Sequence, residues 1–191
     1  MQYLQSIRDR AAPYILGVLA LHILAVPALA LAVGMPIVVP TLLTVAATAI
    51  AIGVWWRHGV DPFARHVIAV IATTVMPALL IYVMRLHPWQ IDFHFQFFAM
   101  LAIITVFCDW RALISSAVMI AAYHVAFALT EPAWIFPGET LLLLRVLLHA
   151  VLVKLELIAL VWLTWRLASA FAEAETATRE AEKARTRARW D

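Results

Sequence analysis

The chain has 191 residues, of which 65% are hydrophobic and only 14% are charged. Because soluble domains carry about 25% charged residues, this composition predicts an integral membrane protein. The formal net charge of +2 provides no basic face outside the C-terminal tail, which argues against nucleic acid as a partner, and the single cysteine excludes an internal disulfide.

Six apolar segments of roughly 17 to 25 residues are each long enough to span a bilayer. Backbone groups inside a membrane must bond within their own segment, so we expect six helices. The first three spans are predicted over about 13–33, 37–56 and 63–84, the next two form a hairpin with its tip at 109, and the sixth begins near Glu139 and reaches about 165. The fold class is therefore all-α: a six-helix transmembrane domain (1–167) whose last helix continues into a cytoplasmic coiled-coil stub (168–191).

Basic residues in the short loops predict the orientation. One side of the membrane receives most of the arginines together with the tail: Arg8, Arg10, Arg57, Arg65, Arg111 and Arg166. The other side receives Arg85, with Glu131 and Glu139. Both termini are therefore expected in the cytoplasm.

The hairpin carries two histidines at equal distances from its tip. His94 lies fifteen residues before Asp109 and His124 fifteen residues after it. At about 1.5 Å per residue, each lies roughly 22 Å from the tip along its own helix. An antiparallel pair therefore places both imidazoles at the same depth, towards the outer face. They are either ligands of a metal ion or haem, or two hydrogen-bonded residues at the membrane edge.

The same stretch carries a family pattern: Asp-x-His-Phe-x-Phe-Phe at 92–98, Asp-Trp at 109–110, then His124 late in the next helix. It resembles the membrane-integral sensor region found upstream of bacterial chemoreceptor, histidine kinase and diguanylate cyclase output domains. The resemblance covers about 88–130. That family is expected to have further histidines where this chain has Gln96 and Tyr123. The resemblance thus implies His94 and His124 as the matching pair, a cytoplasmic output domain beyond the tail, and a location in the inner membrane of a bacterium.

After residue 165 the chain becomes rich in Ala, Glu, Arg and Lys without a helix breaker. Alanines recur at alternating steps of four and three, which is the spacing of a heptad seam: Ala170, Ala174, Ala177, Ala181, Ala184 and Ala188. The tail is either an ordinary amphipathic helix with a solvated face or, as we favour, the start of a signalling coiled coil in a homodimer.

Traced back into the sixth span, this seam reaches Glu156 and His149. Arg145 shares their face to within about 40° at 100° per residue, whereas Lys154 points the opposite way. Ionisable residues inside a span mark functional positions unless they are paired. Either Arg145 and Glu156 have structural roles, or His149 joins the other two histidines and connects a site directly to the tail.

The candidate ligands are therefore His94, His124 and His149, with Asp92 as a further ligand or as a carboxylate that orients His94. Imidazole suits copper, zinc and iron, and haem b is the alternative. A small ion fits between adjacent helices more easily than a haem does. His22 reads as a lone polar residue in its span, and the remaining histidines read as loop or interface residues.

The leading hypothesis is a sensory membrane module that signals through its sixth helix to a cytoplasmic output domain. No nucleophile with a base at a convincing spacing, no phosphate loop and no His-Glu-x-x-His motif is present, so we expect no enzyme activity from this chain. Two alternatives come from other classes. One is a membrane electron-transfer protein with a haem or metal. The other is a small transporter with Arg145, His149 and Glu156 along its pathway.

Overall fold

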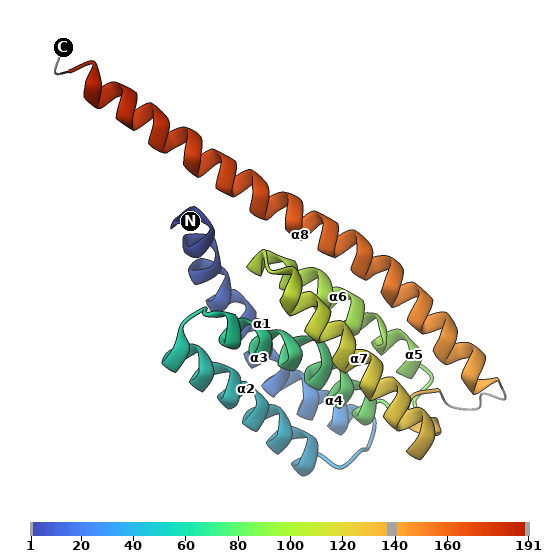
Figure 1. The fold of residues 1–191 in the computed structure, drawn as a ribbon. Helices are drawn as coiled ribbons and strands as arrows, with labels where there is room; N and C mark the ends of the chain where they lie inside the picture. The colour runs from blue at the N-terminus through green and yellow to red at the C-terminus, as the bar shows by residue number, and fades with distance from the viewer. Residues whose placement is uncertain (1, 137–140, 190–191) are drawn as a thin grey trace.

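A computed structural model describes residues 2–136 and 141–189, and nearly all of that length is helical (Figure 1). Within the described residues, six helical segments are long and apolar enough to cross a membrane, as predicted. They are α1 (Gln2–Ala32), α2 (Val38–His58), the segment Pro62–Val83, the segment Gln90–Phe107, α7 (Trp110–Thr130) and α8 (Leu142–Arg187). The start of the sixth span predicted near Glu139 lies outside the described residues.

The third segment consists of α3 (Pro62–Val70), a π-helical turn η1 (Ile71–Val75) and α4 (Met76–Val83). Asp61 caps its start, because its Oδ1 accepts the Ala64 N–H at 2.7 Å and proline suits the first helical turn. The widened turn η1 ends two residues before Pro77, which lacks an N–H and crowds the carbonyl four residues earlier, within η1. The segment therefore continues past its proline through one irregular turn.

The predicted hairpin is present. Its first arm comprises α5 (Gln90–Phe93), α6 (Phe95–Ile104) and the 3₁₀ turn η2 (Thr105–Phe107), and its second arm is α7. Cys108 adopts a left-handed backbone with φ of 47°. Asp109 then caps α7, its Oδ1 accepting the Arg111 N–H at 3.0 Å. The reversal thus occurs at the tip predicted from the sequence.

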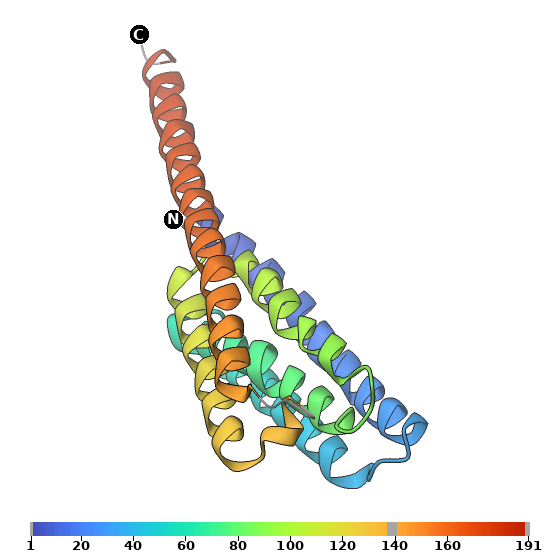
Figure 2. The same cartoon turned by 90° about the vertical axis from the view of Figure 1, so that its right-hand side faces the viewer.

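The six segments are not buried equally. In the apolar part of Pro62–Val83, 67% of the residues are buried, whereas none is buried in the corresponding part of α8. The former contributes Ile68 and Met76 to the core, which also contains Leu19, Phe97 and Leu113. Helix α8 instead lies along the outside of the bundle and runs past the N-terminus (Figures 1 and 2). Its packing on the other helices is thus confined to one side.

Helix α8 continues without interruption from the membrane segment into the tail, as predicted. Its face towards the bundle includes Val153 and Leu160, and further along the buried residues are Thr164 and Glu175. The seam alanines from Ala170 onwards are exposed. A straight helix has 3.6 residues per turn, so its inner face drifts away from a strict heptad pattern. The helix face that contains His149 therefore does not continue into the alanine seam, contrary to the prediction from the sequence. Dimerisation of the tail through a coiled coil stays a prediction.

Candidate functional site

The three predicted histidines come together near the end of the bundle opposite the tail. The ring centroids of His94 and His124 are 5.9 Å apart, and the ring of His149 lies 5.7 Å from the first and 6.0 Å from the second. They come from three different elements: the α5–α6 junction, α7 and α8. The predicted equal depth of His94 and His124 is confirmed, and His149 joins them.

All three rings are held in the same way by their own helices. Each Nδ1 contacts the carbonyl oxygen four residues earlier: His94 that of Gln90 at 3.1 Å, His124 that of Ile120 at 2.8 Å and His149 that of Arg145 at 3.2 Å. A carbonyl only accepts, so Nδ1 is the protonated nitrogen in these contacts. In a neutral imidazole, Nε2 then carries the free lone pair.

Two of these Nε2 atoms have no hydrogen-bond partner. The Nε2 atoms of His94 and His124 are buried, and the part of the chain that the structure describes offers them no donor. His22 differs, although it is also buried and its Nδ1 also contacts a carbonyl, that of Val18. The amide of Gln96 donates to its Nε2 at 3.2 Å. A buried acceptor without a partner costs about 1–3 kcal/mol, so the histidine cluster stands out from the satisfied pair beside it.

The surroundings of the three rings are aromatic and apolar. Phe136 stacks on His94 with 5.5 Å between centroids and an interplanar angle of 17°, and it also contacts His149 at 4.8 Å. Phe97 lies 5.0 Å from His124 and 6.2 Å from His94. A cavity of about 280 Å³ between α7 and α8 reaches two of the rings and is otherwise lined almost entirely by apolar side chains.

The triangle is slightly too wide to ligate an ion as it stands. Imidazole nitrogens bind a first-row metal at about 2.0–2.1 Å, which places the centroids of three such rings roughly 5–5.5 Å apart. The observed separations are larger by a few tenths of an ångström. Accordingly, no group of three or more His, Cys, Asp or Glu side chains among the described residues is close enough to hold a metal ion without movement.

The charged residues predicted around the site have other positions. The side chain of Asp92 is exposed, and the Gln90 carbonyl occupies the Nδ1 position of His94 that a carboxylate was expected to fill. The guanidinium of Arg145 lies 5.8 Å from the ring centre of Phe136, beside the cluster. Glu156 lies two helical turns beyond His149 on α8, and its Oε2 is buried without a hydrogen-bond partner in the described structure. Asp92 is thus not the orienting carboxylate of His94.

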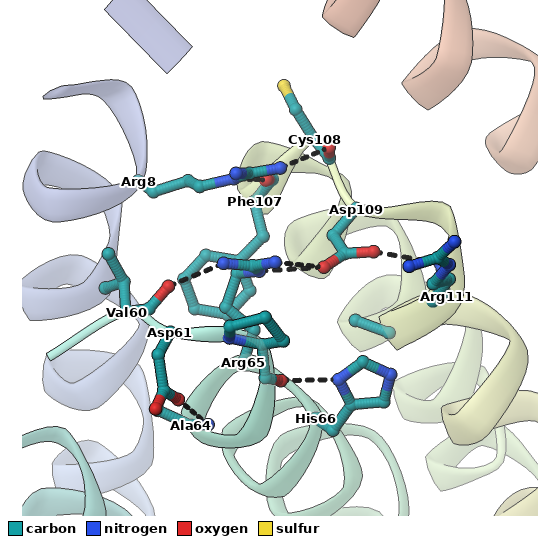
Figure 3. A network of polar contacts seen from close by, with 12 residues as sticks. Arg8, Val60, Asp61, Ala64, Arg65, His66, Phe107, Cys108, Asp109 and Arg111 are labelled. Atoms are coloured by element: carbon teal, nitrogen blue, oxygen red, sulfur yellow. Dashed lines mark hydrogen bonds and ion pairs between the residues drawn. The ribbon is translucent and has the colours of Figure 1, made fainter. Parts of the chain in front are cut away.

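A second polar cluster, which the sequence did not predict, lies at the opposite end of the bundle (Figure 3). Arg65 of α3 meets the Oδ2 of Asp109 through Nη2 at 2.6 Å and Nε at 2.8 Å, and its Nη1 donates to the Val60 carbonyl. Arg8 of α1 donates to the carbonyls of Phe107 and Cys108. This cluster ties α1 and α3 to the hairpin tip.

The pKa values of the two titratable groups at this tip, Asp109 and Cys108, are shifted in opposite directions. Burial acts to raise the pKa of Asp109, but the hydrogen bond and charge of Arg65 outweigh it and leave the pKa below its ordinary value. Burial raises the pKa of the Cys108 thiol, which the charge of Arg8 only partly opposes. At neutral pH the tip therefore contains an ionised aspartate and a protonated thiol.

Comparison with known proteins adds no relative: no family model, no curated protein and no solved structure matches this chain. The argument for its function therefore depends on the geometry described above.

Proposed function

We propose that this chain is the membrane module of a sensor. It would bind a transition metal ion through His94, His124 and His149 and transmit the binding event along α8. The observation that carries the proposal is the triangle of three rings whose Nδ1 atoms are all occupied by their own helices. The Nε2 atoms are thereby left as the nitrogens that a ligand could use, and those of His94 and His124 are buried without a hydrogen-bond partner in the described structure.

The compactness of the triangle favours an ion over a haem. A haem with two histidine ligands needs them on opposite faces of a flat macrocycle. Phe97 contacts both His94 and His124, so an aromatic ring already fills the space beside that pair. A single ion among the three rings needs only a small inward movement. The ligand we propose is therefore a metal ion and not haem b.

The ligand set favours copper in its monovalent state. In the described part of the chain, no carboxylate is hydrogen-bonded to the three rings, so the ligands are neutral. The cost of burying a charge in an apolar environment rises steeply with that charge. A monovalent ion is therefore easier to hold here than Zn²⁺ or Fe²⁺, while imidazole remains a suitable copper ligand.

The position of His149 provides the route for a signal. It lies on α8, which packs on the outside of the bundle and continues into the tail (Figure 2). Because the rings must approach to share one ion, an ion that binds all three favours arrangements with α8 closer to α6 and α7. Ligand binding then shifts the population of helix arrangements, which a cytoplasmic output domain can read.

The first experiment is a metal titration of the full chain in mild detergent under reducing conditions. We expect one equivalent of Cu(I) to bind the wild type. Each of His94→Ala, His124→Ala and His149→Ala should weaken binding by more than about a hundredfold, because loss of a direct ligand costs more than loss of an outer partner. The matched control is His22→Ala, which removes a buried histidine whose Nε2 already has a partner. Its copper affinity should equal that of the wild type.

Failure of the wild type to bind copper, zinc or iron at micromolar concentration would contradict the proposal. An equal loss in His22→Ala and His124→Ala would also contradict it, because a general effect on the fold would then explain both results.

The signalling step has its own test: spin labels at Val125 of α7 and Leu152 of α8, two exposed positions, with Cys108→Ser to avoid a third label. Copper should shorten the distance between these labels.

A further inference from the structure

We propose that a second site, at the tail end of the bundle, binds a phosphate group, and that an anionic phospholipid headgroup is its main source. The site is an open cavity of about 370 Å³ lined by residues of α1, α3, α7, α8 and the hairpin tip. It lies beside the hairpin tip of Figure 3 and shares no residue with the histidine cluster. The proposal is thus independent of the sensor function.

The lining of this cavity is positively charged. It contains three arginines, Arg8, Arg65 and Arg111, and one carboxylate, that of Asp109. Three positive charges against one negative charge leave a formal surplus of +2. The carboxylate is already engaged, since Arg65 binds its Oδ2 and the Arg111 backbone N–H binds its Oδ1. An anion entering the cavity would therefore meet unneutralised arginine charge.

Donor groups remain available on two of these arginines. Arg8 uses Nε and Nη2 to bind the carbonyls of the tip, which fixes its guanidinium and leaves the N–H groups of Nη1 for a ligand. Arg111 is exposed, and its described side-chain contact is with the ring of Trp110 at 5.3 Å. Guanidinium groups held in this way suit the planar, two-pronged recognition of phosphate oxygens.

Thr164 gives a second, independent indication of a ligand. It is completely buried and lines the cavity, yet its Oγ1 has no hydrogen-bond partner in the described structure. Helical threonines normally donate to the carbonyl four residues earlier. Thr176 and Thr178 of the same helix do so at 3.0 and 2.9 Å. The hydroxyl of Thr164 is therefore a free donor beside the arginines.

Two tryptophans place this cavity at the level of lipid headgroups. Trp110 and Trp165 line it and are both exposed. Tryptophan is enriched at the membrane–water interface, and basic pockets between membrane helices bind acidic headgroups. A phospholipid can thus place its phosphate among the arginines while its acyl chains stay in the bilayer. Because the cavity joins α1 and α8, such a lipid would hold α8 against the bundle where it leaves the membrane.

The test is native mass spectrometry of the full chain in detergent, titrated with phosphatidylglycerol or with phosphatidylcholine of the same acyl chains. We expect a preference of about tenfold for phosphatidylglycerol. Arg111→Gln and Thr164→Val should each weaken it about fivefold, and neither changes a hydrogen bond that holds the tip together. The control is Arg57→Gln, which removes an exposed arginine at the same end of the bundle but outside the cavity, and its preference should be unchanged.

A second arm identifies the source of the phosphate: inorganic phosphate is titrated into the chain in phosphatidylcholine nanodiscs and followed by calorimetry. No binding in this arm, together with the expected lipid preference, assigns the site to a phospholipid. Millimolar binding that Arg111→Gln and Thr164→Val abolish assigns it to free phosphate, with the same chemistry. The proposal is overturned if neither probe binds preferentially, or if Arg57→Gln weakens binding as much as Arg111→Gln.

Discussion

The Arg65–Asp109 pair and the histidine cluster lie at opposite ends of the helix bundle and differ in how their buried polar groups are satisfied. At the tail end, Arg65 and Asp109 are both 7% exposed and each is bonded to the other and to a backbone group. At the other end, His94 and His124 are as deeply buried, yet their Nε2 atoms have no partner. The first arrangement satisfies its buried groups within the chain, whereas the second leaves two buried acceptors without a partner.

We propose that this contrast indicates a ligand site better than residue type does. Arginine, aspartate and histidine inside a membrane protein all suggest function. What distinguishes the Arg65–Asp109 pair from the histidine cluster is whether the buried side-chain groups have partners within the described chain. His22 supports this criterion, because the same residue type at similar burial is satisfied by Gln96. The predictions below test the criterion at both ends.

The largest effect is expected from breaking the satisfied pair. Arg65→Met leaves the Asp109 carboxylate buried without its partner, which should lower the free energy of unfolding by about 3–5 kcal/mol. The measurement is denaturant unfolding in detergent, followed by the reaction of Cys108, the single and buried thiol, with a fluorescent maleimide.

The control is the double variant Arg65→Met, Asp109→Asn. It removes the uncompensated charge but keeps an N-cap oxygen for α7, so it should recover most of the loss. Equal stability of the single and double variants would mean that the pair does not stabilise this end.

The next largest effect is expected from binding copper to the histidine cluster. Copper at about a hundred times its dissociation constant should raise the free energy of unfolding by about 2.7 kcal/mol. Removing it with a Cu(I) chelator should reverse the gain. In His124→Ala the gain should disappear, whereas His22→Ala should retain it. A gain that persists in His124→Ala would place copper elsewhere in the chain.

Acid should weaken the tail end selectively. The pKa of Asp109 is lowered in the folded chain, so its contribution to stability is complete above the unfolded pKa of about 3.9 and is lost as pH falls through the lower folded value. The wild type should therefore lose more stability on acidification through this range than the Arg65→Met, Asp109→Asn variant does. The decrease in the free energy of unfolding of the wild type on acidification should be smaller than the decrease caused by Arg65→Met, because a protonated Asp109 keeps hydrogen bonds. Parallel pH curves for the two proteins would contradict this assignment.

The sequence predicted those features that depend on spacing along one helix or around one turn. The equal depth of His94 and His124 follows from a fixed rise per residue on each side of Asp109. These distances are set within single elements and their hairpin, so they can be read from the chain.

The missed features depend on which side chains meet across separate helices. Arg65 and Asp109 are far apart in sequence, and their pairing is set by the packing of α3 on the hairpin tip. The pairing of His22 with Gln96 likewise depends on how α1 packs against α6. Asp92 was expected to orient His94. Instead, the Nδ1 of His94 contacts the backbone carbonyl of Gln90, four residues earlier in the chain. Local backbone acceptors thus compete with the partners expected from composition.

The smallest effect is expected from removing an unsatisfied group, and it completes the contrast between the two ends. His124→Leu replaces a buried imidazole with an apolar side chain of similar size. It loses the Nδ1 bond to Ile120 but also removes an acceptor that has no partner, so the free energy of unfolding should change by less than about 1 kcal/mol. Copper binding should nevertheless be lost. A loss as large as that of Arg65→Met would show that His124 is a structural residue and that burial without a partner does not mark the functional end.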